Sequence, residues 1–252
     1  MDEEKKECPI CGGTFWVEKG DGVVRCSCYK EYLKKKRIEE AQIPSAYKNK
    51  KLENYKPLTN SQGRALKISN EFVKEFLNGK MDRGLLFMGK TGVGKTHLAI
   101  GILNALLDEG FRGYFINFIH LIEKIKSSYN PLSQSAFSEP EFFNRIKRSH
   151  IIVIDELGAQ TPTEFAFNKM YDIINYCFSE GISIIFTTNY YLMDEKRKNP
   201  TDIKLDSTSY ISKLHKYYLE ERISDRLVSR ILGKCIKVEI EGIDYRRKFN
   251  VY

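Results

Sequence analysis

The sequence lacks any long apolar run, and this excludes several classes of protein. No stretch of its 252 residues approaches the roughly 18 apolar residues that a membrane helix requires, so we expect no membrane span. The first ten residues, MDEEKKECPI, are too polar for a secretory signal. With 42% hydrophobic and 29% charged residues, the composition is that of a soluble globular protein, for which we expect a cytoplasmic location.

Large apolar side chains are also scarce in residues 1–28, which therefore cannot build a core of their own. This segment holds four of the six cysteines: Cys8 and Cys11 are spaced C-x-x-C, and Cys26 and Cys28 are spaced C-x-C. Four thiolates satisfy the tetrahedral preference of Zn²⁺, and zinc binding would fold a segment that lacks a core. We therefore predict a zinc site, with reduced free cysteines or an iron cluster as alternatives.

Acidic residues are fewer than basic ones. The formal net charge is +8, and the pI is near 9.0, which favours an anionic partner such as a nucleic acid. Charge alone is weak evidence, because many basic proteins carry only solvated lysine faces.

Two prolines indicate a linker between two domains. A basic helical stretch, residues 29–42, is followed by a polar segment that contains Pro44 and Pro57 and is typical of a linker. We divide the chain there into residues 1–45, a zinc module with a basic helix, and residues 46–252, the main domain.

From about residue 61 onward, helical and strand patterns alternate. Apolar runs typical of strands buried on both faces occupy residues 84–89, 113–118, 150–155, 183–189 and 234–242. Helical patterns occupy residues 61–79, 96–110, 120–129 and 163–181. This alternation predicts a doubly covered parallel sheet. Residues 130–140 and 194–209 are predicted to be loops.

Three arginines follow one another at intervals of four residues near the end of the chain: Arg222, Arg226 and Arg230. We predict one helix over residues 219–231. Its apolar stripe, which should face the core, consists of Leu219, Ile223, Leu227 and Ile231. The arginines lie on a neighbouring stripe, and by themselves they form a solvated flank that is available for salt bridges or phosphate contacts.

The segment GKTGVGKT, residues 89–96, follows an apolar strand and precedes a helix, which is the context of a phosphate-binding loop. Gly89 and Gly94 let the backbone turn its amides toward phosphate oxygens. Lys95 is placed to reach the β and γ phosphates of ATP, and Thr96 offers a hydroxyl to Mg²⁺. The predicted nucleotide-binding residues are Gly89, Gly92, Val93, Gly94, Lys95, Thr96, His97 and Asp155.

Two adjacent carboxylates, Asp155 and Glu156, end the apolar run HIIVIDE. Asp155 is placed to hold Mg²⁺, and Glu156 to polarise the water that attacks the γ phosphate. Asn189 ends the next apolar run, IIFTTN, and its amide could orient the same water. The alternatives are a solvated acidic pair in a turn and an ordinary turn asparagine.

The motifs GKTGVGKT, IIVIDELGAQ, IIFTTN and ERISDRL, in this order, resemble the AAA+ ATPases of the DnaC/DnaI helicase-loader group, with IstB-type ATPases as close relatives. The resemblance covers roughly residues 43–252. It implies a five-stranded parallel sheet between helices and the binding of ATP and single-stranded DNA. It also implies side-by-side self-association and the delivery of a DnaB-type replicative helicase to DNA. Because about a dozen residues follow the last predicted strand, the helical lid of most AAA+ proteins should be reduced or absent.

The resemblance also assigns roles that spacing alone does not. It implies that Arg226 is the arginine finger given to a neighbouring subunit's nucleotide, and that Arg246, or alternatively Arg247, senses the γ phosphate from within. It further implies that residues 1–45 grip the helicase, whereas the basic stretch after the cysteines also fits a DNA-binding zinc ribbon. Two alternative functions remain: an IstB-like transposition helper and a nucleotide-dependent DNA-binding adaptor.

Overall fold

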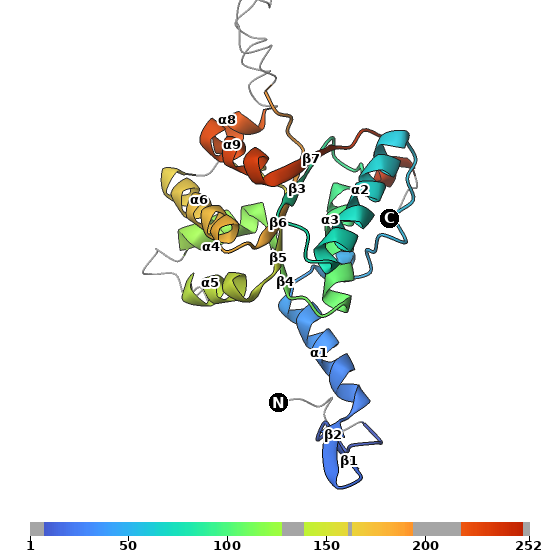
Figure 1. Cartoon of the computed structure of the whole chain (residues 1–252). Coiled ribbons are helices and arrows are strands. Elements are labelled where there is room, and N and C mark those ends of the chain that lie inside the picture. The colour runs from blue at the N-terminus through green and yellow to red at the C-terminus, as the bar shows by residue number, and fades with distance from the viewer. Residues whose placement is uncertain (1–7, 128–138, 161–162, 194–217, 249–252) are drawn as a thin grey trace, which may run out of the picture.

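The structure is a computed structural model that describes residues 8–127, 139–160, 163–193 and 218–248. The chain forms an α/β body from which one helix carries a small N-terminal module outward (Figure 1). Most of the predicted loop at 130–140 and the whole of the one at 194–209 lie outside the described residues.

The body is built on a five-stranded sheet, which confirms the predicted fold class. The strands are β3 (Gly84–Met88), β4 (Gly113–Asn117), β5 (Ile151–Asp155), β6 (Ser183–Thr188) and β7 (Cys235–Glu239). Their order is β4-β5-β6-β3-β7, and every neighbouring pair is parallel. β3, β5 and β6 are buried along their whole length, as their continuous apolar runs predict.

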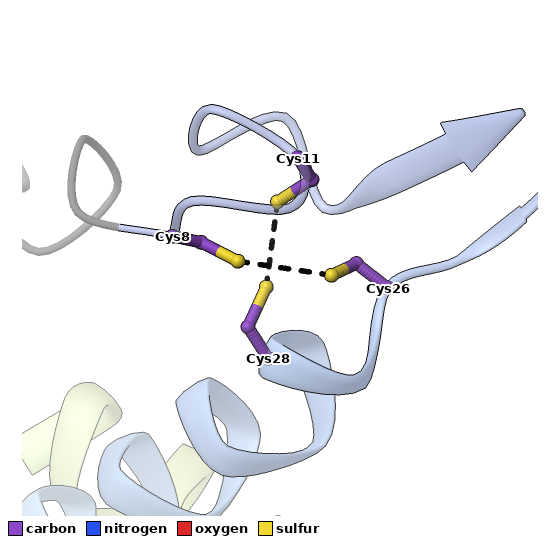
Figure 2. Close-up of side chains that lie close together, drawn as sticks. All are labelled: Cys8, Cys11, Cys26 and Cys28. Carbon is purple, nitrogen blue, oxygen red and sulfur yellow. Dashed lines mark hydrogen bonds between the residues drawn. The ribbon is translucent and has the colours of Figure 1, made fainter.

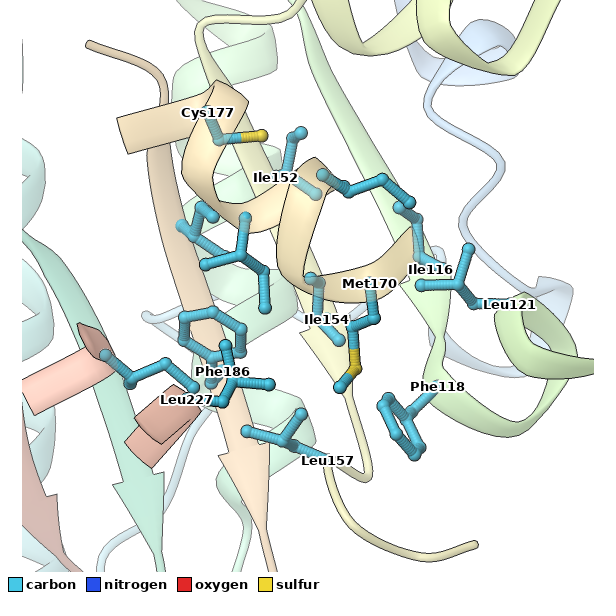
Figure 3. Close-up of a cluster of buried hydrophobic side chains, with 14 of the residues drawn as sticks. Ile116, Phe118, Leu121, Ile152, Ile154, Leu157, Met170, Cys177, Phe186 and Leu227 are labelled. Carbon is cyan, nitrogen blue, oxygen red and sulfur yellow. The ribbon is translucent and has the colours of Figure 1, made fainter. Parts of the chain in front are cut away.

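Helices cover both faces of this sheet (Figure 1). One face carries α2 (Asn60–Leu77) and α3 (Lys95–Asp108). The other carries α4 (Phe118–Ser127), α5 (Glu139–Arg148), α6 (Glu164–Ser179), α8 (Leu219–Ile223) and α9 (Asp225–Lys234). Figure 3 shows the core on this second face, where Met170, Phe186 and Leu227 pack together with the strand residues. After β7 the described chain holds only α10 (Tyr245–Lys248), so a helical lid is absent from the described residues.

Two local expectations are wrong. α5 begins at Glu139, within the predicted loop; Phe142 and Ile146, spaced four apart, are both buried and provide its apolar stripe. The single helix expected over residues 219–231 is broken at Ser224, which adopts a left-handed φ of 73°. The predicted apolar stripe is nevertheless buried throughout, because each short helix keeps its own apolar face toward the sheet.

The N-terminal module consists of the antiparallel pair β1 (Trp16–Lys19) and β2 (Gly22–Arg25), followed by α1 (Ser27–Glu40). α1 is anchored to the body near its C-terminal end. There Arg37 Nε donates to Leu107 O at 3.2 Å, Lys34 pairs with Asp108 at 3.0 Å, and the Phe115 amide donates to Ala41 O at 2.8 Å. A short 3-10 turn, η2 (Ser45–Tyr47), leads on toward α2. None of the described helices is long and apolar enough to cross a membrane.

Gly84 provides a test of how closely β3 packs. A methyl group at this position would overlap the carbonyl oxygen of Ile184 and lie 2.9 Å from Cys235 Sγ. We expect Gly84→Ala to lower the free energy of unfolding by about 3 kcal/mol, because backbone on the neighbouring strand would have to move. Gly63→Ala is the matched control, since nothing lies within 4 Å of its added methyl and alanine favours a helix. Urea unfolding of both variants compares them, and equal stabilities would contradict the expectation.

Candidate functional site

The loop GKTGVGKT joins β3 to α3 at the carboxyl edge of the sheet. Gly89, Gly92 and Gly94 have φ of 147°, 81° and 99°, values that residues other than glycine rarely adopt. Gly94 is the residue that precedes α3, and Lys95 and Thr96 are the first residues of that helix. The loop therefore places backbone amides and a helix N-terminus together, the arrangement that binds phosphate.

Lys95 joins this loop to the end of β6. Its Nζ donates to the carbonyl oxygens of Gly89 and Lys90 and to Oδ1 of Asn189, each at 2.7 Å. Burial lowers the pKa of Lys95 to about 8. The three oxygens that accept hydrogen bonds from the ammonium are all neutral, and phosphate oxygens would add negative charge and make the hydrogen bonds stronger.

Asp155 lies beside Thr96, as a magnesium site requires. Its Oδ1 accepts hydrogen bonds from Thr96 Oγ1 at 2.9 Å and from Thr187 Oγ1 at 2.5 Å. Burial raises the pKa of Asp155, and these two hydrogen bonds oppose the shift. The hydroxyl and the carboxylate are hard oxygen ligands on adjacent elements, so this pair fits Mg²⁺.

Glu156 is held by residues of β4 and β6. Its backbone has a left-handed φ of 60°, its amide donates to Thr187 Oγ1 at 3.0 Å, and its Oε2 accepts from Asn117 Nδ2 at 3.1 Å. Both carboxylates border a cavity of about 250 Å³ that Tyr47 and Tyr114 also line. Burial, and then the charges of Asp155 and Glu156, raise the pKa of Tyr47.

Side chains from distant parts of the chain brace the phosphate loop. The carbonyl oxygen of Val93 accepts from Tyr55 Oη at 3.1 Å and from Gln62 Nε2 at 3.2 Å. The amide of Tyr245 donates to Gly92 O at 3.0 Å, so the first residue of α10 lies directly on the loop.

Two predicted site residues point to other partners. His97 Nε2 lies 2.9 Å from Lys51 O and 2.8 Å from Asn54 Oδ1, so its ring contacts the linker. Arg246 donates through its amide and its Nε to Asp244 Oδ1, at 3.0 and 3.4 Å. Burial is the main cause of the low pKa of Lys95, and the Arg246 charge adds to it, which places Arg246 near the loop. The side chain of Arg247 lies outside the described part of the chain.

The three arginines have different surroundings. Arg222 donates from Nε to Gly158 O at 2.8 Å and from Nη2 to Ala159 O at 3.1 Å. Arg226 is exposed, and its guanidinium lies 4.4 Å from the centre of the Tyr171 ring. Arg230 is exposed further along α9. Arg222 is thus committed to the protein's own backbone, whereas Arg226 lies at the surface.

The four N-terminal cysteines converge on one point (Figure 2). Their Sγ atoms all lie within 4.8 Å of one another; the Cys8–Cys26 distance is 3.8 Å and the Cys11–Cys28 distance is 3.5 Å. Sulfurs at about 2.3 Å from one tetrahedral zinc would lie about 3.8 Å apart, so the cluster fits this metal. Amide hydrogen bonds from Cys11 and Ile10 lower the pKa of Cys8, which favours the thiolate that a metal binds.

Comparison with known proteins places the chain. A family described as IstB-like ATP binding protein matches residues 33–208, which is more than half of the chain. The chain belongs to this family.

Among relatives of this IstB-like ATP binding protein is the replicative helicase loader DnaC of Escherichia coli (strain K12). The two are 32% identical over 123 residues, or 49% of this chain and 48% of that protein, so the match spans about half of the relative. The crystal structure of the DnaC helicase loader has a TM-score of 0.61 and 31% identity, and the match covers 79% of this chain and all of that one. The crystal structure of DnaI, at 22% identity and a TM-score of 0.60, covers 83% and 100% and supports the fold.

Membership of the IstB-like ATP binding proteins confirms the predicted family, and the solved structures confirm the AAA+ core. The residues that sequence reasoning missed are Asn117, Tyr55 and Gln62. Arg222 was expected on a solvated flank, and the structure shows it bonded instead to the backbone of Gly158 and Ala159. Asn117 had a usable signal, because it is a polar residue at the end of a buried strand, like Asp155. Tyr55 and Gln62 had no such signal, because each lies in a stretch that contains many other polar or aromatic residues.

Proposed function

We propose that this chain is an ATP-hydrolysing loader of a DnaB-type replicative helicase. One observation carries the proposal: Lys95, Asp155, Glu156 and Asn189 lie at one edge of a sheet, in a chain similar to DnaC over 79% of its length. Those residues suit ATP hydrolysis. The relatives are named as replicative helicase loaders, and this supports the choice of partner.

In the proposed reaction, phosphate oxygens of ATP replace the carbonyl oxygens that hold Lys95. Thr96 and Asp155 would hold Mg²⁺, which would supply positive charge to offset that on the β and γ phosphates. Glu156 accepts a proton from the attacking water while the amide of Asn189 orients that water.

Charge that develops on the γ phosphate needs a further cation. We assign Arg226 of a neighbouring subunit to this role, because its guanidinium is exposed, whereas that of Arg222 is bound internally. Arg246 is assigned to contact the same phosphate from within the subunit. This arrangement requires the chain to self-associate with nucleotide bound between subunits.

The second part of the proposal concerns residues 1–45, which we assign as a zinc-binding module that contacts the helicase, with residues 46–252 as the ATPase domain. The module projects from the body on α1 and leaves its far end free for a partner (Figure 1). Ile10 and Val23 in the module are 67% and 63% exposed, which suits protein contact better than a solvated surface.

Co-purification with the replicative helicase of the host, with and without ATP, tests the loader function. We expect the intact chain to retain the helicase and a Cys8→Ser/Cys11→Ser variant to lose it, because the module no longer folds. Cys235→Ala, which removes a buried thiol of the sheet, is the control and should retain the helicase. A chain that binds DNA but never the helicase would instead favour a nucleotide-dependent DNA-binding adaptor.

We also propose that the chain binds single-stranded DNA. The net charge of +8 supports this, as does a groove of about 590 Å³ between α1 and α5. The groove has two carboxylates, Glu40 and Glu141, and a larger set of cations: Lys36, Arg37, Arg112, Arg145 and Arg148. Fluorescence anisotropy with labelled oligothymidine should show that the affinity falls steeply between roughly 50 and 200 mM salt. Affinity independent of salt would count against phosphate contacts.

A further inference from the structure

α8 is a helix of five residues that contacts both loops carrying the proposed hydrolytic residues. On one side, Arg222 binds the loop that follows Glu156. On the other side, the Leu219 amide donates to Tyr191 O at 2.8 Å, and the Met193 amide donates to the Glu220 carboxylate at 3.0 and 3.1 Å. These residues follow Asn189 closely in the chain, so α8 is fixed to the segments after both β5 and β6.

The contact made by Arg222 is two-pronged. Its Nε and Nη2 reach two successive carbonyl oxygens, those of Gly158 and Ala159, and its guanidinium lies 5.2 Å from the centre of the Tyr190 ring. A methyl group on Gly158 would lie 3.1 Å from Cβ of Arg222, so the loop and helix pack closely there. A guanidinium that donates two hydrogen bonds from its planar group fixes the orientation of the helix relative to the loop. A lysine ammonium that donates one hydrogen bond does not.

The loop that Arg222 holds is itself tied to β6. The Leu157 amide donates to Thr187 O at 2.8 Å, and Thr188 Oγ1 donates to Leu157 O at 2.8 Å. A displacement of Glu156 would therefore be passed through residues 157–159 to Arg222.

Arg226 lies immediately beyond α8. Ser224 alone separates α8 from α9, with its amide bonded to Glu220 O at 2.8 Å and its carbonyl accepting from Val228 N at 3.1 Å. Arg226 is the second residue of α9, and its Nε donates to Tyr171 Oη at 3.2 Å. This short, hydrogen-bonded connection leaves little freedom between Arg222 and Arg226.

We infer that Arg222 is a positioning residue that fixes Arg226 relative to the Glu156 loop of the same subunit. The arginine finger that a subunit presents to its neighbour then depends on the state of the presenting subunit's own nucleotide site. This inference rests on the proposed role of Arg226 as a finger in trans.

The test uses mixtures of two inactive variants of the full chain. Arg226→Ala subunits keep an intact nucleotide site but give no finger, and Glu156→Gln subunits bind ATP and give a finger but do not hydrolyse ATP themselves. ATP hydrolysis in the mixture therefore occurs in the first variant with a finger from the second. Adding Arg222→Ala to the finger-giving subunit should lower this restored kcat about tenfold with little change in KM for ATP.

Two further variants separate positioning from general damage. Lys234→Ala in the finger-giving subunit removes an exposed cation of α9 and should leave the restored kcat unchanged. Arg222→Lys, which keeps the charge but makes one hydrogen bond at a time, should give an intermediate rate. If Arg222→Ala unfolds at the assay temperature, Arg222→Lys carries the comparison.

The outcomes distinguish the two ideas. If the mixture without an Arg222 variant does not hydrolyse ATP, Arg226 is not a finger in trans, and the inference about Arg222 is wrong as well. Full restoration by finger-giving subunits that carry Arg222→Ala or Arg222→Lys overturns the inference and leaves the finger standing. A loss seen only when the Arg222 variant is placed in the hydrolysing subunit overturns it too, because Arg222 would then serve its own site alone.

Discussion

Glu156→Gln should abolish ATP hydrolysis and leave ATP binding intact. The amide oxygen of glutamine can still accept the hydrogen bond that Asn117 Nδ2 gives to Glu156, so the loop should keep its geometry. The amide cannot accept the proton of the attacking water, and loss of a general base typically lowers a rate by roughly 10²–10⁴-fold. We therefore expect phosphate release to fall by at least about a hundredfold, while a fluorescent ATP analogue binds with unchanged affinity.

Glu75→Gln, a change of the same kind on the exposed face of α2, is the control and should hydrolyse ATP like the unaltered chain. A Glu156→Gln variant with normal phosphate release would remove Glu156 as the base. A variant that lost nucleotide binding would show instead that the carboxylate supports the shape of the site.

Removing the metal should unfold the N-terminal module and spare the body of the protein. Within residues 8–40, which the structure describes in full, Cys11 and Cys26 are the only buried side chains, so a metal bound by the four cysteines would take the place of a core. Structural zinc contributes about 10–16 kcal/mol of apparent binding energy to such small domains, which far exceeds what the few remaining contacts supply. We therefore expect a chelator to melt residues 8–26 and to leave the thermal unfolding of the sheet nearly unchanged.

The chain carries its own reporter for this experiment. Trp16 is the only tryptophan in the sequence, it lies in β1, and the Arg25 guanidinium sits 3.8 Å from the centre of its ring. Chelation should shift its fluorescence to longer wavelength, and added zinc should reverse the shift. Cys177→Ala, in the core of the sheet, should respond like the parent, whereas Cys26→Ser should show the shifted spectrum from the start. Metal-free protein with unshifted Trp16 fluorescence would contradict the zinc site.

The parts of the fold that could be predicted are those that depend on the spacing of residues close together in the sequence. The phosphate loop, the strands and the cysteine pairs depend on residues within ten positions of one another, so a single stretch carries each signal. Gly89 follows β3 and Asp155 ends β5, and because the sheet is parallel, both loops lie at its carboxyl edge.

What could not be predicted depends on contacts between distant segments. Nothing in the composition near Tyr55 or Gln62 indicates that both reach Val93 O, since a hydrogen-bond donor is common in any linker. The break at Ser224 was equally hidden. An apolar residue every fourth position is compatible with one long helix or with two short ones, and the tie between Arg222 and Gly158 O exists only once the sheet is assembled.

The attachment of α1 to β4 gives the protein a mechanical path. The Phe115 amide is bonded to Ala41 O just beyond α1, and two residues later Asn117 holds the carboxylate of Glu156. A partner that pulls on the far end of α1, about 21 Å away along its 14 residues, would therefore pull on the edge strand β4, which holds Glu156, the proposed proton acceptor. By thermodynamic reciprocity, a nucleotide that moves Asn117 would also change how tightly a partner is bound at the far end of α1. Partner binding and ATP hydrolysis would then be coupled through β4.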